Sequence, residues 1–503
     1  MRMFPPAAPF GFRKDCGINP VWHNASLASG HSNFQFVDQY FDSCNTVQRI
    51  FSLARKLGFR SFCVEDVDPS TPAFIADNEE ISQCTPVYQK SKAYRVSFFL
   101  SESEPKGSED FLGYVIIKKD FYNGRVNKNV SAERMYVYES VLKPYRTEKE
   151  NNFIRCKRDY AVSFSFGDYT VNGALYAQQN AVSSVCAHVG LRSVLSLMLP
   201  HGDISYADIN AHTKIDKRTI FEGLDPISIQ NVLNANNIKF RKIVHEPTQL
   251  IVPPDKAYNR NLYGYIESGC PALLAFEFHG ERHVVPVLGH TFNEDTWIPE
   301  ARRWYFKNMP YYSSEGWLST YLVHDDNFGP YLCIPREYLE FERFRLLYGV
   351  QWDHYALCYD KIEIVALDRL LQFAAQNPMI PNIPWYNRFA AHAKNRMLVL
   401  RSMYMYRDDY IQKRIQTDGN SDANIERLLN ILPDRFWMVE VSCPELFSAS
   451  RSKFGEIFLA CDTIDAQFNG HAYPIALRLP GLVYIENEQL PYLTNNTHYS
   501  DLN

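Results

Sequence analysis

Several features that would place this chain in a familiar class are missing from its sequence. None of its eleven cysteines belongs to a Cys-x-x-Cys pair, so neither a zinc site nor a redox motif is indicated. A glycine-rich phosphate loop and an HExxH motif are also absent. The net charge is −5, and no lysine/arginine run occurs that would follow a nucleic-acid backbone. We therefore expect no metal, no cofactor and no nucleic-acid partner.

Long apolar segments are missing as well. No stretch of about 18 apolar residues is present, so no membrane contact is expected. The N-terminal MRMFPPAAPFGFRKD contains prolines and charges where a secretory signal would have an apolar run. The cysteines are odd in number and scattered from Cys16 to Cys461, which does not suggest a disulfide framework. These observations predict a cytoplasmic protein with reduced thiols, while the oligomeric state stays open.

The length and composition of the chain predict a globular protein with more than one hydrophobic core. Hydrophobic residues make up 46% and charged residues 22%, an ordinary composition, and 503 residues predict several domains. We predict an N-terminal α+β unit over 1–165, with a helix at 45–58 followed by a small antiparallel sheet. Residues 166–360 have a helix before antiparallel strands, which is typical of an α+β fold. Residues 361–503 predict a C-terminal mixed α/β unit.

One helix near the middle of the chain carries a candidate nucleophile. The segment QQNAVSSVCAHVGLRSVLSLMLP over 178–200 predicts an amphipathic helix with Cys186 in its first turn. Ser183 or Ser184 is the expected N-cap. The positive end of a helix dipole favours thiolate over thiol, which a sulfur nucleophile requires. Cys186 is therefore the candidate nucleophile.

Side-chain amides precede this cysteine. An amide placed beside a nucleophile can donate a hydrogen bond to the oxyanion that forms during acyl transfer. Gln179 is the expected donor, and Gln178 and Asn180 remain alternatives.

Downstream residues supply a base and an acid. A cysteine nucleophile needs a base, and the base needs a third group that orients it. His283 opens a strand after a predicted hairpin turn at 279–280, and Asp325 ends the strand YLVHD. The period of two in a strand puts Asp325 and Asp326 on opposite faces. We expect Asp325 to face His283, with Asp326 and Asn327 as alternatives.

Taken in order, these residues resemble the papain-like cysteine peptidases, especially the compact branch that processes bacteriocin leaders. The resemblance covers roughly residues 176–335. In that branch a glutamine precedes a cysteine at a helix start, Gly-x-Pro leads into a strand, a histidine opens the next strand, and an aspartate closes another. The matching positions are Gln179, Cys186, the Gly269-Cys270-Pro271 run, His283, Gly289 and Asp325.

The resemblance implies a papain-like domain and an enzyme, a thiol hydrolase that cleaves a peptide or isopeptide bond in a protein or peptide substrate. Cys186 would be the nucleophile, His283 the base and then the acid, Asp325 its orienting group, and Gln179 an oxyanion donor. The same triad would serve acyl transfer or deamidation of the transglutaminase kind. A catalytically inactive binding or sensor module is the third possibility that the resemblance leaves open.

Two departures from the family pattern stand out. The family has six positions from the glutamine to the cysteine, whereas Gln179 lies seven before Cys186 and Asn180 occupies the sixth position. The distance from His283 to Asp325 is also longer than in the family. Residues 291–319 are therefore expected to form an insertion that serves as a lid or substrate wall.

Three other histidines lie close to this pattern. His188 follows Cys186 on the same helix and is expected to be a surface or packing residue. His279 is expected to be solvated in the hairpin turn. His290 lies at the far end of the strand from His283, so it is not expected to serve the same site.

Overall fold

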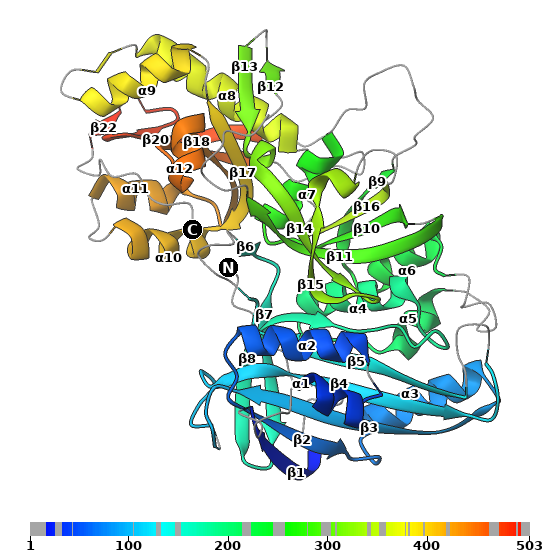
Figure 1. Ribbon diagram of the computed structural model, residues 1–503. Coiled ribbons are helices and arrows are strands. Elements are labelled where there is room, and N and C mark those ends of the chain that lie inside the picture. Colours follow the sequence, from blue (N-terminus) through cyan, green and yellow to red (C-terminus); the bar gives the residue numbers. More distant parts are fainter. Residues whose placement is uncertain are drawn as a thin grey trace.

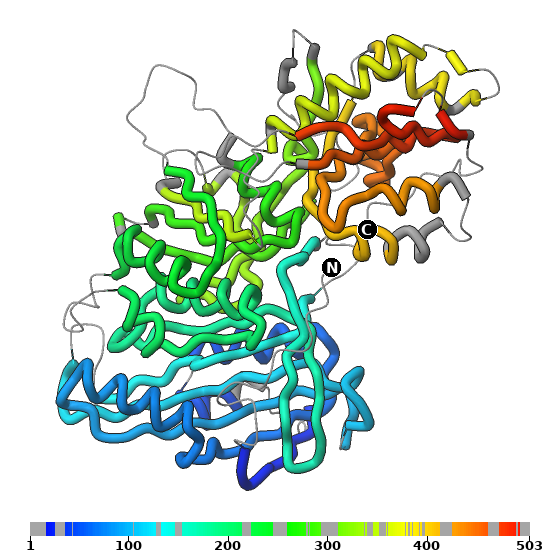
Figure 2. Tube along the Cα trace, turned by 180° about the vertical axis from the view of Figure 1, so that it is seen from behind, coloured from blue at the N-terminus to red at the C-terminus, as the bar shows by residue number. Residues whose placement is uncertain are grey.

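The chain forms three sheets that follow one another along an elongated molecule (Figures 1 and 2). In the computed structural model, the described residues form a mixed α+β structure with twelve α-helices. Strands β13 and β17 are the one parallel pair among the strand pairings of these residues. The expected α+β class is confirmed. No helix of the described part is long and apolar enough to cross a membrane. The structure describes residues 17–25, 33–42, 44–103, 105–126, 132–145, 152–213, 223–244, 257–278, 280–292, 303–306, 309–339, 344–351, 359–377, 379–380, 383–395, 398–418, 423–461, 472–488 and 491–493.

The first sheet is N-terminal and has seven strands. In spatial order these are β1 (Gly17–Asn24), β2 (Ser61–Val67), β3 (Tyr88–Phe99), β4 (Phe111–Tyr122), β5 (Glu133–Leu142), β8 (Gly167–Tyr176) and β7 (Arg158–Phe164). The helices of this region are α1 (Asn33–Tyr40), α2 (Asn45–Lys56) and α3 (Pro72–Cys84). The predicted helix at 45–58 is confirmed by α2, whose regularly spaced apolar side chains are buried. The predicted antiparallel sheet is also present, and it is larger than expected because β1, β2 and β8 join it.

The second sheet lies in the middle of the molecule and carries the candidate histidine and acid. Its main path is β15 (Gly329–Pro335), β14 (Leu318–Asp325), β11 (Glu281–Phe292), β10 (Ala272–Phe278), β16 (Phe344–Gln351) and β9 (Lys239–Val244), with β6 (Asn152–Ile154) beside β11. Its helices are α4 (Cys186–Met198), α5 (Tyr206–Thr213), α6 (Pro226–Ala235), α7 (Ala257–Glu267) and the 3₁₀ turns η4 (Ser314–Trp317) and η5 (Arg336–Leu339). The β10–β11 hairpin is present as predicted, although His279 in its turn lies outside the described residues.

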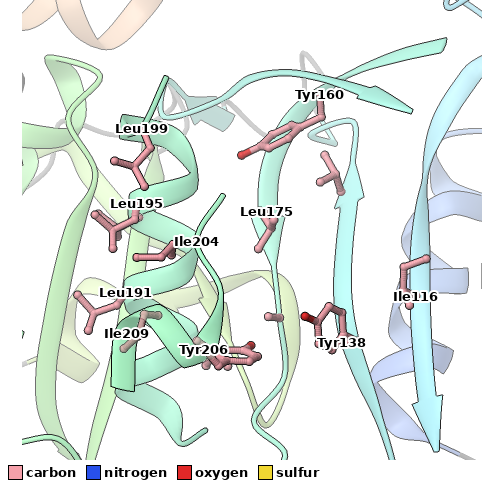
Figure 3. Packing of buried hydrophobic residues seen from close by; sticks show 14 of the residues in the cluster. Ile116, Tyr138, Tyr160, Leu175, Leu191, Leu195, Leu199, Ile204, Tyr206 and Ile209 are labelled. Atoms are coloured by element: carbon pink, nitrogen blue, oxygen red, sulfur yellow. The ribbon is translucent and has the colours of Figure 1, made fainter. Parts of the chain in front are cut away.

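Helix α4 lies between the first two sheets. It contacts β8 of the first sheet and β10 and β11 of the second, and every side chain from Ala187 to Met198 is buried. Figure 3 shows Leu191 and Leu195 of this helix in one cluster with Leu175 of β8 and Tyr138 of β5. A helix that is buried all round needs apolar or paired side chains on every face. The predicted helix is therefore present, but it is buried on every face, and α4 is a core helix.

The third sheet is C-terminal and has eight strands. In order these are β12 (Arg303–Phe306), β13 (Met309–Ser313), β17 (Val399–Tyr406), β18 (Arg435–Ser442), β19 (Gly455–Cys461), β20 (Ala472–Leu479), β21 (Leu482–Ile485) and β22 (Tyr492–Leu493). The helices are α8 (Tyr359–Gln376), α9 (Pro384–Asn395), α10 (Arg407–Asp418), α11 (Ala423–Ile431) and α12 (Pro444–Ser450).

The sheets cross the unit limits that the sequence suggested. Strand β8 falls after the predicted limit at 165, yet it pairs with β5 and β7 of the first sheet. Residues 291–319 were expected to form an insertion that serves as a lid or substrate wall. In their described part, β12 and β13 form a hairpin that joins β17 of the third sheet. Strand pairing over long sequence distances decides both cases, and local composition carries no signal for it.

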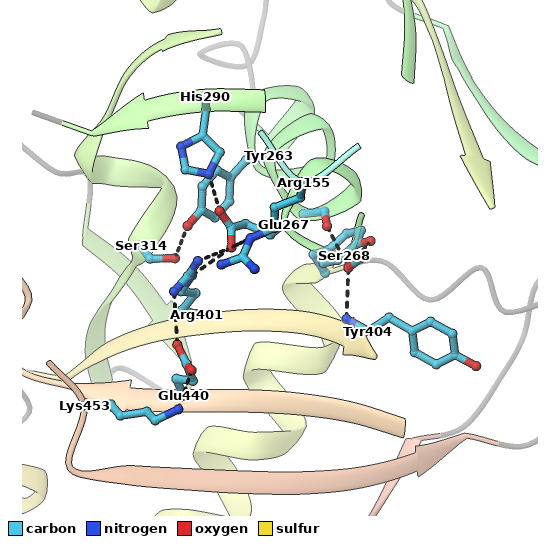
Figure 4. A network of polar contacts seen from close by, with 12 residues as sticks. Arg155, Tyr263, Glu267, Ser268, His290, Ser314, Arg401, Tyr404, Glu440 and Lys453 are labelled. Atoms are coloured by element: carbon cyan, nitrogen blue, oxygen red, sulfur yellow. Dashed lines mark hydrogen bonds and ion pairs between the residues drawn. The ribbon is translucent and has the colours of Figure 1, made fainter. Parts of the chain in front are cut away.

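Buried charges join the second sheet to the third (Figure 4). The Glu267 carboxylate at the end of α7 pairs with Arg401 of β17, Arg155 and His290, and Arg401 also pairs with Glu440 of β18. A buried charge is tolerated only when it is paired. This network therefore fixes β17 against α7 and β11.

A glycine in β11 allows β6 to lie against that strand. A Cβ atom at Gly289 would lie 2.4 Å from the Phe153 carbonyl oxygen of β6. We expect Gly289→Ala to destabilise this sheet by about 1–3 kcal/mol through overpacking, seen as a lower melting temperature in thermal denaturation. Gly190→Ala in α4 is the control, since the nearest atom to its Cβ would be the flexible end of Leu273 at 3.1 Å, and no backbone atom is among its three nearest contacts. Equal melting of the two variants would contradict the close approach of β6.

Candidate active site

Cys186 is the first residue of α4, as the sequence predicted. The expected caps are wrong: the N-cap is Val185, whose backbone N–H donates to Nδ1 of His188 at 3.3 Å. Ser183 and Ser184 are not caps because their hydroxyls accept hydrogen bonds from Asn180 instead. The first N–H groups of a helix have no acceptor within it, so Cys186 lies at the positive end of the dipole.

Asn180 organises the turn that leads into the helix. Its Oδ1 accepts hydrogen bonds from the backbone N–H groups of Val182, Ser183 and Ser184 at 2.9–3.0 Å. Its Nδ2 donates to the Ser183 hydroxyl at 2.8 Å. The Asn180 side chain is fully buried. It therefore serves the turn and is a poor candidate for an oxyanion donor.

The two glutamines before it differ in what they bind. The Gln178 side-chain oxygen accepts a hydrogen bond from the Val137 N–H of β5 at 3.0 Å. The Gln179 carbonyl oxygen accepts one from Arg134 at 3.0 Å. Within the part of the chain that the structure describes, no hydrogen bond is found for the half-buried Gln179 side-chain amide. Gln179 thus stays the preferred oxyanion donor of the three amides.

The structure brings the candidate base and acid together. His283 lies near the start of β11, and Asp325 is the last residue of β14. The two strands are antiparallel neighbours, and the distance from His283 Nε2 to Asp325 Oδ2 is 3.0 Å. The edge of the Phe276 ring packs against the imidazole, with 5.6 Å between the ring centroids. Both contacts hold the imidazole in one orientation.

Asp326 also approaches His283, which the sequence did not predict. Its Oδ1 lies 3.5 Å from His283 Nε2. The expected opposite faces for Asp325 and Asp326 are wrong because the pairing of β14 with β15 shifts register between Val323 and Asp325, and a turn begins at Asp326. Strand periodicity does not apply in a turn.

The third alternative, Asn327, belongs to this turn. Its backbone N–H, like that of Phe328, donates to Asp325 Oδ1, at 2.9 and 3.1 Å. Its side-chain nitrogen lies 3.5 Å from Asp326 Oδ1. Asn327 therefore supports the acids instead of contacting the imidazole directly.

Cys186 also interacts with the imidazole. His283 shares a side-chain hydrogen bond with Cys186. Because Nε2 faces Asp325, Nδ1 is the ring nitrogen that is left for the sulfur. Cys186 is half-buried, so it is accessible from one side. Cys186, His283 and Asp325 are thus a connected set.

The electrostatics of the set favour a charged imidazole. Burial by itself would lower the pKa of His283, but hydrogen bonds to Asp325 and Cys186 and the charges of both carboxylates raise the pKa to about 10. Burial would raise the pKa of Asp325, but the bond to His283 and the turn N–H groups hold that pKa below its usual range. Burial and the charge of Asp325 outweigh the attraction of His283 and raise the pKa of Asp326 to about 6.

The other histidines have structural roles. His188 is fully buried and its Nε2 lies 2.8 Å from Asn210 Oδ1, while burial lowers its pKa to about 4. His290 bonds to Glu267 in the network of Figure 4, away from the site as predicted. His324 points away from His283: its Nδ1 lies 3.1 Å from the Leu175 carbonyl oxygen, and burial lowers its pKa to about 3.

Residues of the first sheet and of α2 support the turn at 326–328 that joins β14 to β15 (the acid turn), and no local sequence pattern indicates them. The Tyr176 hydroxyl of β8 donates to the Asp325 carbonyl oxygen at 3.3 Å. Arg49 of α2 donates to the carbonyl oxygens of Pro330 and Tyr331, each at 3.1 Å. These bonds join segments that are far apart in the sequence, so no local pattern predicts them.

No family model matches the chain, and no curated protein matches it. The resemblance to papain-like peptidases therefore remains a prediction. The contact between His283 and Asp325 is an observation that stands apart from it.

The raised pKa of His283 makes stability depend on pH. The folded value of about 10 lies above the ordinary 6.5, so this stabilisation is complete below about pH 6.5 and is lost as the pH rises through about 10. We expect the melting temperature to fall over this window, and to fall less in Asp325→Asn. Ring signals in NMR titrations should give the midpoint for His283. A midpoint near 6.5 in the wild type would contradict the interaction.

Proposed function

We propose that the chain is a thiol hydrolase of the papain-like type, which cleaves a peptide or isopeptide bond through an acyl-enzyme. The observation that carries this proposal is the position of His283, which bonds to Asp325 through Nε2 and shares a hydrogen bond with Cys186. A cysteine at a helix start, a base, and an acid that orients the base are the parts that such chemistry requires.

Before the substrate binds, the Cys186 thiolate and the His283 imidazolium would form an ion pair. A His283 pKa of about 10 favours an imidazolium at neutral pH, and an imidazolium beside the sulfur stabilises the thiolate. The helix dipole acts in the same direction. Asp325 keeps the ring in place and stabilises its positive charge.

The reaction proceeds in two balanced steps. The thiolate of Cys186 attacks the carbonyl carbon, and the His283 imidazolium gives its proton to the leaving nitrogen as the carbon–nitrogen bond breaks. Water then attacks the thioester and gives a proton to His283, and the carbon–sulfur bond breaks. The carboxylic acid is released, and the thiolate–imidazolium pair is restored. The Cys186 N–H and the Gln179 amide are the proposed donors to the oxyanion.

Alkylation tests the ion pair. We expect iodoacetamide at pH 6.5 to modify Cys186 at least about tenfold faster than Cys333, since a thiolate reacts and a thiol does not. Cys333 is the control because it is exposed. Peptide mass spectrometry at graded times gives both rates. If Cys186 reacts as slowly as Cys333 and His283→Ala changes nothing, the thiol-hydrolase proposal fails.

Two conservative variants distinguish the role of Asp325 from that of Asp326. We expect Asp325→Asn to slow Cys186-dependent turnover by about 10- to 100-fold, less than the ~10⁴ loss in a serine triad, because a thiolate–imidazolium pair depends less strongly on the third group. Asp326→Asn should cause a smaller loss, since Asp326 lies 3.5 Å from the ring against 3.0 Å for Asp325. A larger loss in Asp326→Asn would assign the orienting role to Asp326.

The reaction product shows whether water or an amine accepts the acyl group from Cys186. A Cys186→Ala variant is used to capture a substrate from lysate, which is then given to the wild-type protein. Mass spectrometry shows hydrolysis as a cut chain, deamidation as an amide converted to an acid, and acyl transfer as a new amide to an added amine. We expect a cut chain. A new amide would replace hydrolysis with acyl transfer on the same triad.

A further inference from the structure

We propose that His283, Asp325 and Asp326 form a binding site for a divalent transition-metal ion such as Zn²⁺, and that the bound ion withdraws His283 from Cys186. The regulatory part rests on the proposed function, whereas metal binding itself does not. The site would make the thiol chemistry sensitive to the free concentration of the metal.

The donor atoms have the right type and spacing. One imidazole nitrogen and two carboxylate oxygens are ordinary zinc ligands, and their donor atoms lie within 4.8 Å of one another. His283 Nε2 lies 3.0 Å from Asp325 Oδ2 and 3.5 Å from Asp326 Oδ1. Zinc bonds of 2.0–2.2 Å in a tetrahedron place neighbouring ligands about 3.4 Å apart. The observed spacings lie on either side of this value, so small shifts would complete the set.

Asp326 supplies an independent reason to expect a cation. Its side chain is 1% exposed, and in the described part of the chain its Oδ2 has no hydrogen-bond partner. The role of an orienting acid is already filled by Asp325, which accepts bonds on both oxygens. A buried carboxylate oxygen without a donor is costly. A metal ion that binds the Asp326 carboxylate would remove this cost.

Two guanidinium groups face the acids from other elements. Arg49 of α2 acts on Asp325, and Arg134 of β5 acts on Asp326. Each already donates to backbone carbonyl oxygens, Arg49 to that of Pro330 and Arg134 to that of Gln179. Among the described residues, no ion pair joins either guanidinium to these acids. They would weaken the binding of a cation without occupying its place.

Binding would change the state of the imidazole. The metal takes the Nε2 lone pair, so the Nε2 proton of the imidazolium is released to solvent. An imidazole bound through Nε2 no longer carries the positive charge that favours the Cys186 thiolate. Cys186 is not among the three clustered donors, so it is not needed as a ligand, and water would complete the coordination. The metal would therefore inhibit the thiol and not activate it.

Equilibrium dialysis of the full chain against Zn²⁺ tests the site. We expect one ion per chain in the wild type and an affinity at least about tenfold lower in Asp326→Asn, as for the loss of a ligand. Asp208→Asn is the matched control because Asp208 is an exposed carboxylate of α5. Cys186→Ala should keep the ion. The site is overturned if the wild type does not bind one ion per chain. It is also overturned if the wild type and Asp326→Asn bind equally, and the stability of the variant does not change this conclusion.

Cobalt reports the ligands directly. We expect Co²⁺ to give the visible spectrum of a tetrahedral nitrogen and oxygen site, without a thiolate charge-transfer band. Such a band, or loss of the ion in Cys186→Ala, would overturn the ligand set of His283, Asp325 and Asp326.

Alkylation separates this inference from the proposed function. Saturating Zn²⁺ should slow iodoacetamide modification of Cys186 at least about tenfold in the wild type, since the thiolate is the reactive form, and much less in Asp326→Asn. If the ion binds but the rate is unchanged, the regulatory role is overturned. If Cys186 is unreactive without metal while the ion still binds, the proposed function fails and the metal site stands.

Discussion

The burial of α4 between two sheets is the constraint on which the site depends. Arg192 in this helix is buried, and its guanidinium bonds to Asp203 and, across to β5 of the first sheet, to Glu139. Breaking one partner of such a set would leave an uncompensated buried charge, which typically costs about 3–5 kcal/mol. Helix α4 therefore cannot slide along its axis without a large cost. The start of the helix, and with it Cys186, is fixed against both sheets.

Asp325 is also held by segments that precede α4 in the chain. Tyr176 ends the strand that leads to Cys186, and its hydroxyl bonds to the Asp325 backbone. Arg49 of α2 bonds to β15 just after the acid turn. These contacts thus help to set the distance between Cys186 and Asp325. A middle unit expressed without the first sheet and α2 would lack these contacts.

The third sheet is connected through buried charge and shared strands. Glu267 joins α7 to β17 through Arg401, and the hairpin β12–β13 leaves the middle unit to pair with β17. The strand β11 carries both His283 and His290, and His290 bonds to Glu267. The base and the network of Figure 4 therefore share one strand, which links the site to the C-terminal unit through continuous backbone.

The sequence by itself determined the local features of this protein. Helical spacing fixed α2, and the position of Cys186 at a helix start and of His283 near a strand start followed from nearby residues. Tertiary structure decided the remainder: the burial of α4, the place of β12 and β13, and the approach of Asp326 to His283. Periodicity describes which face a residue takes within one element. Strand partners, register shifts and turns depend on contacts between distant segments, and no local pattern records these.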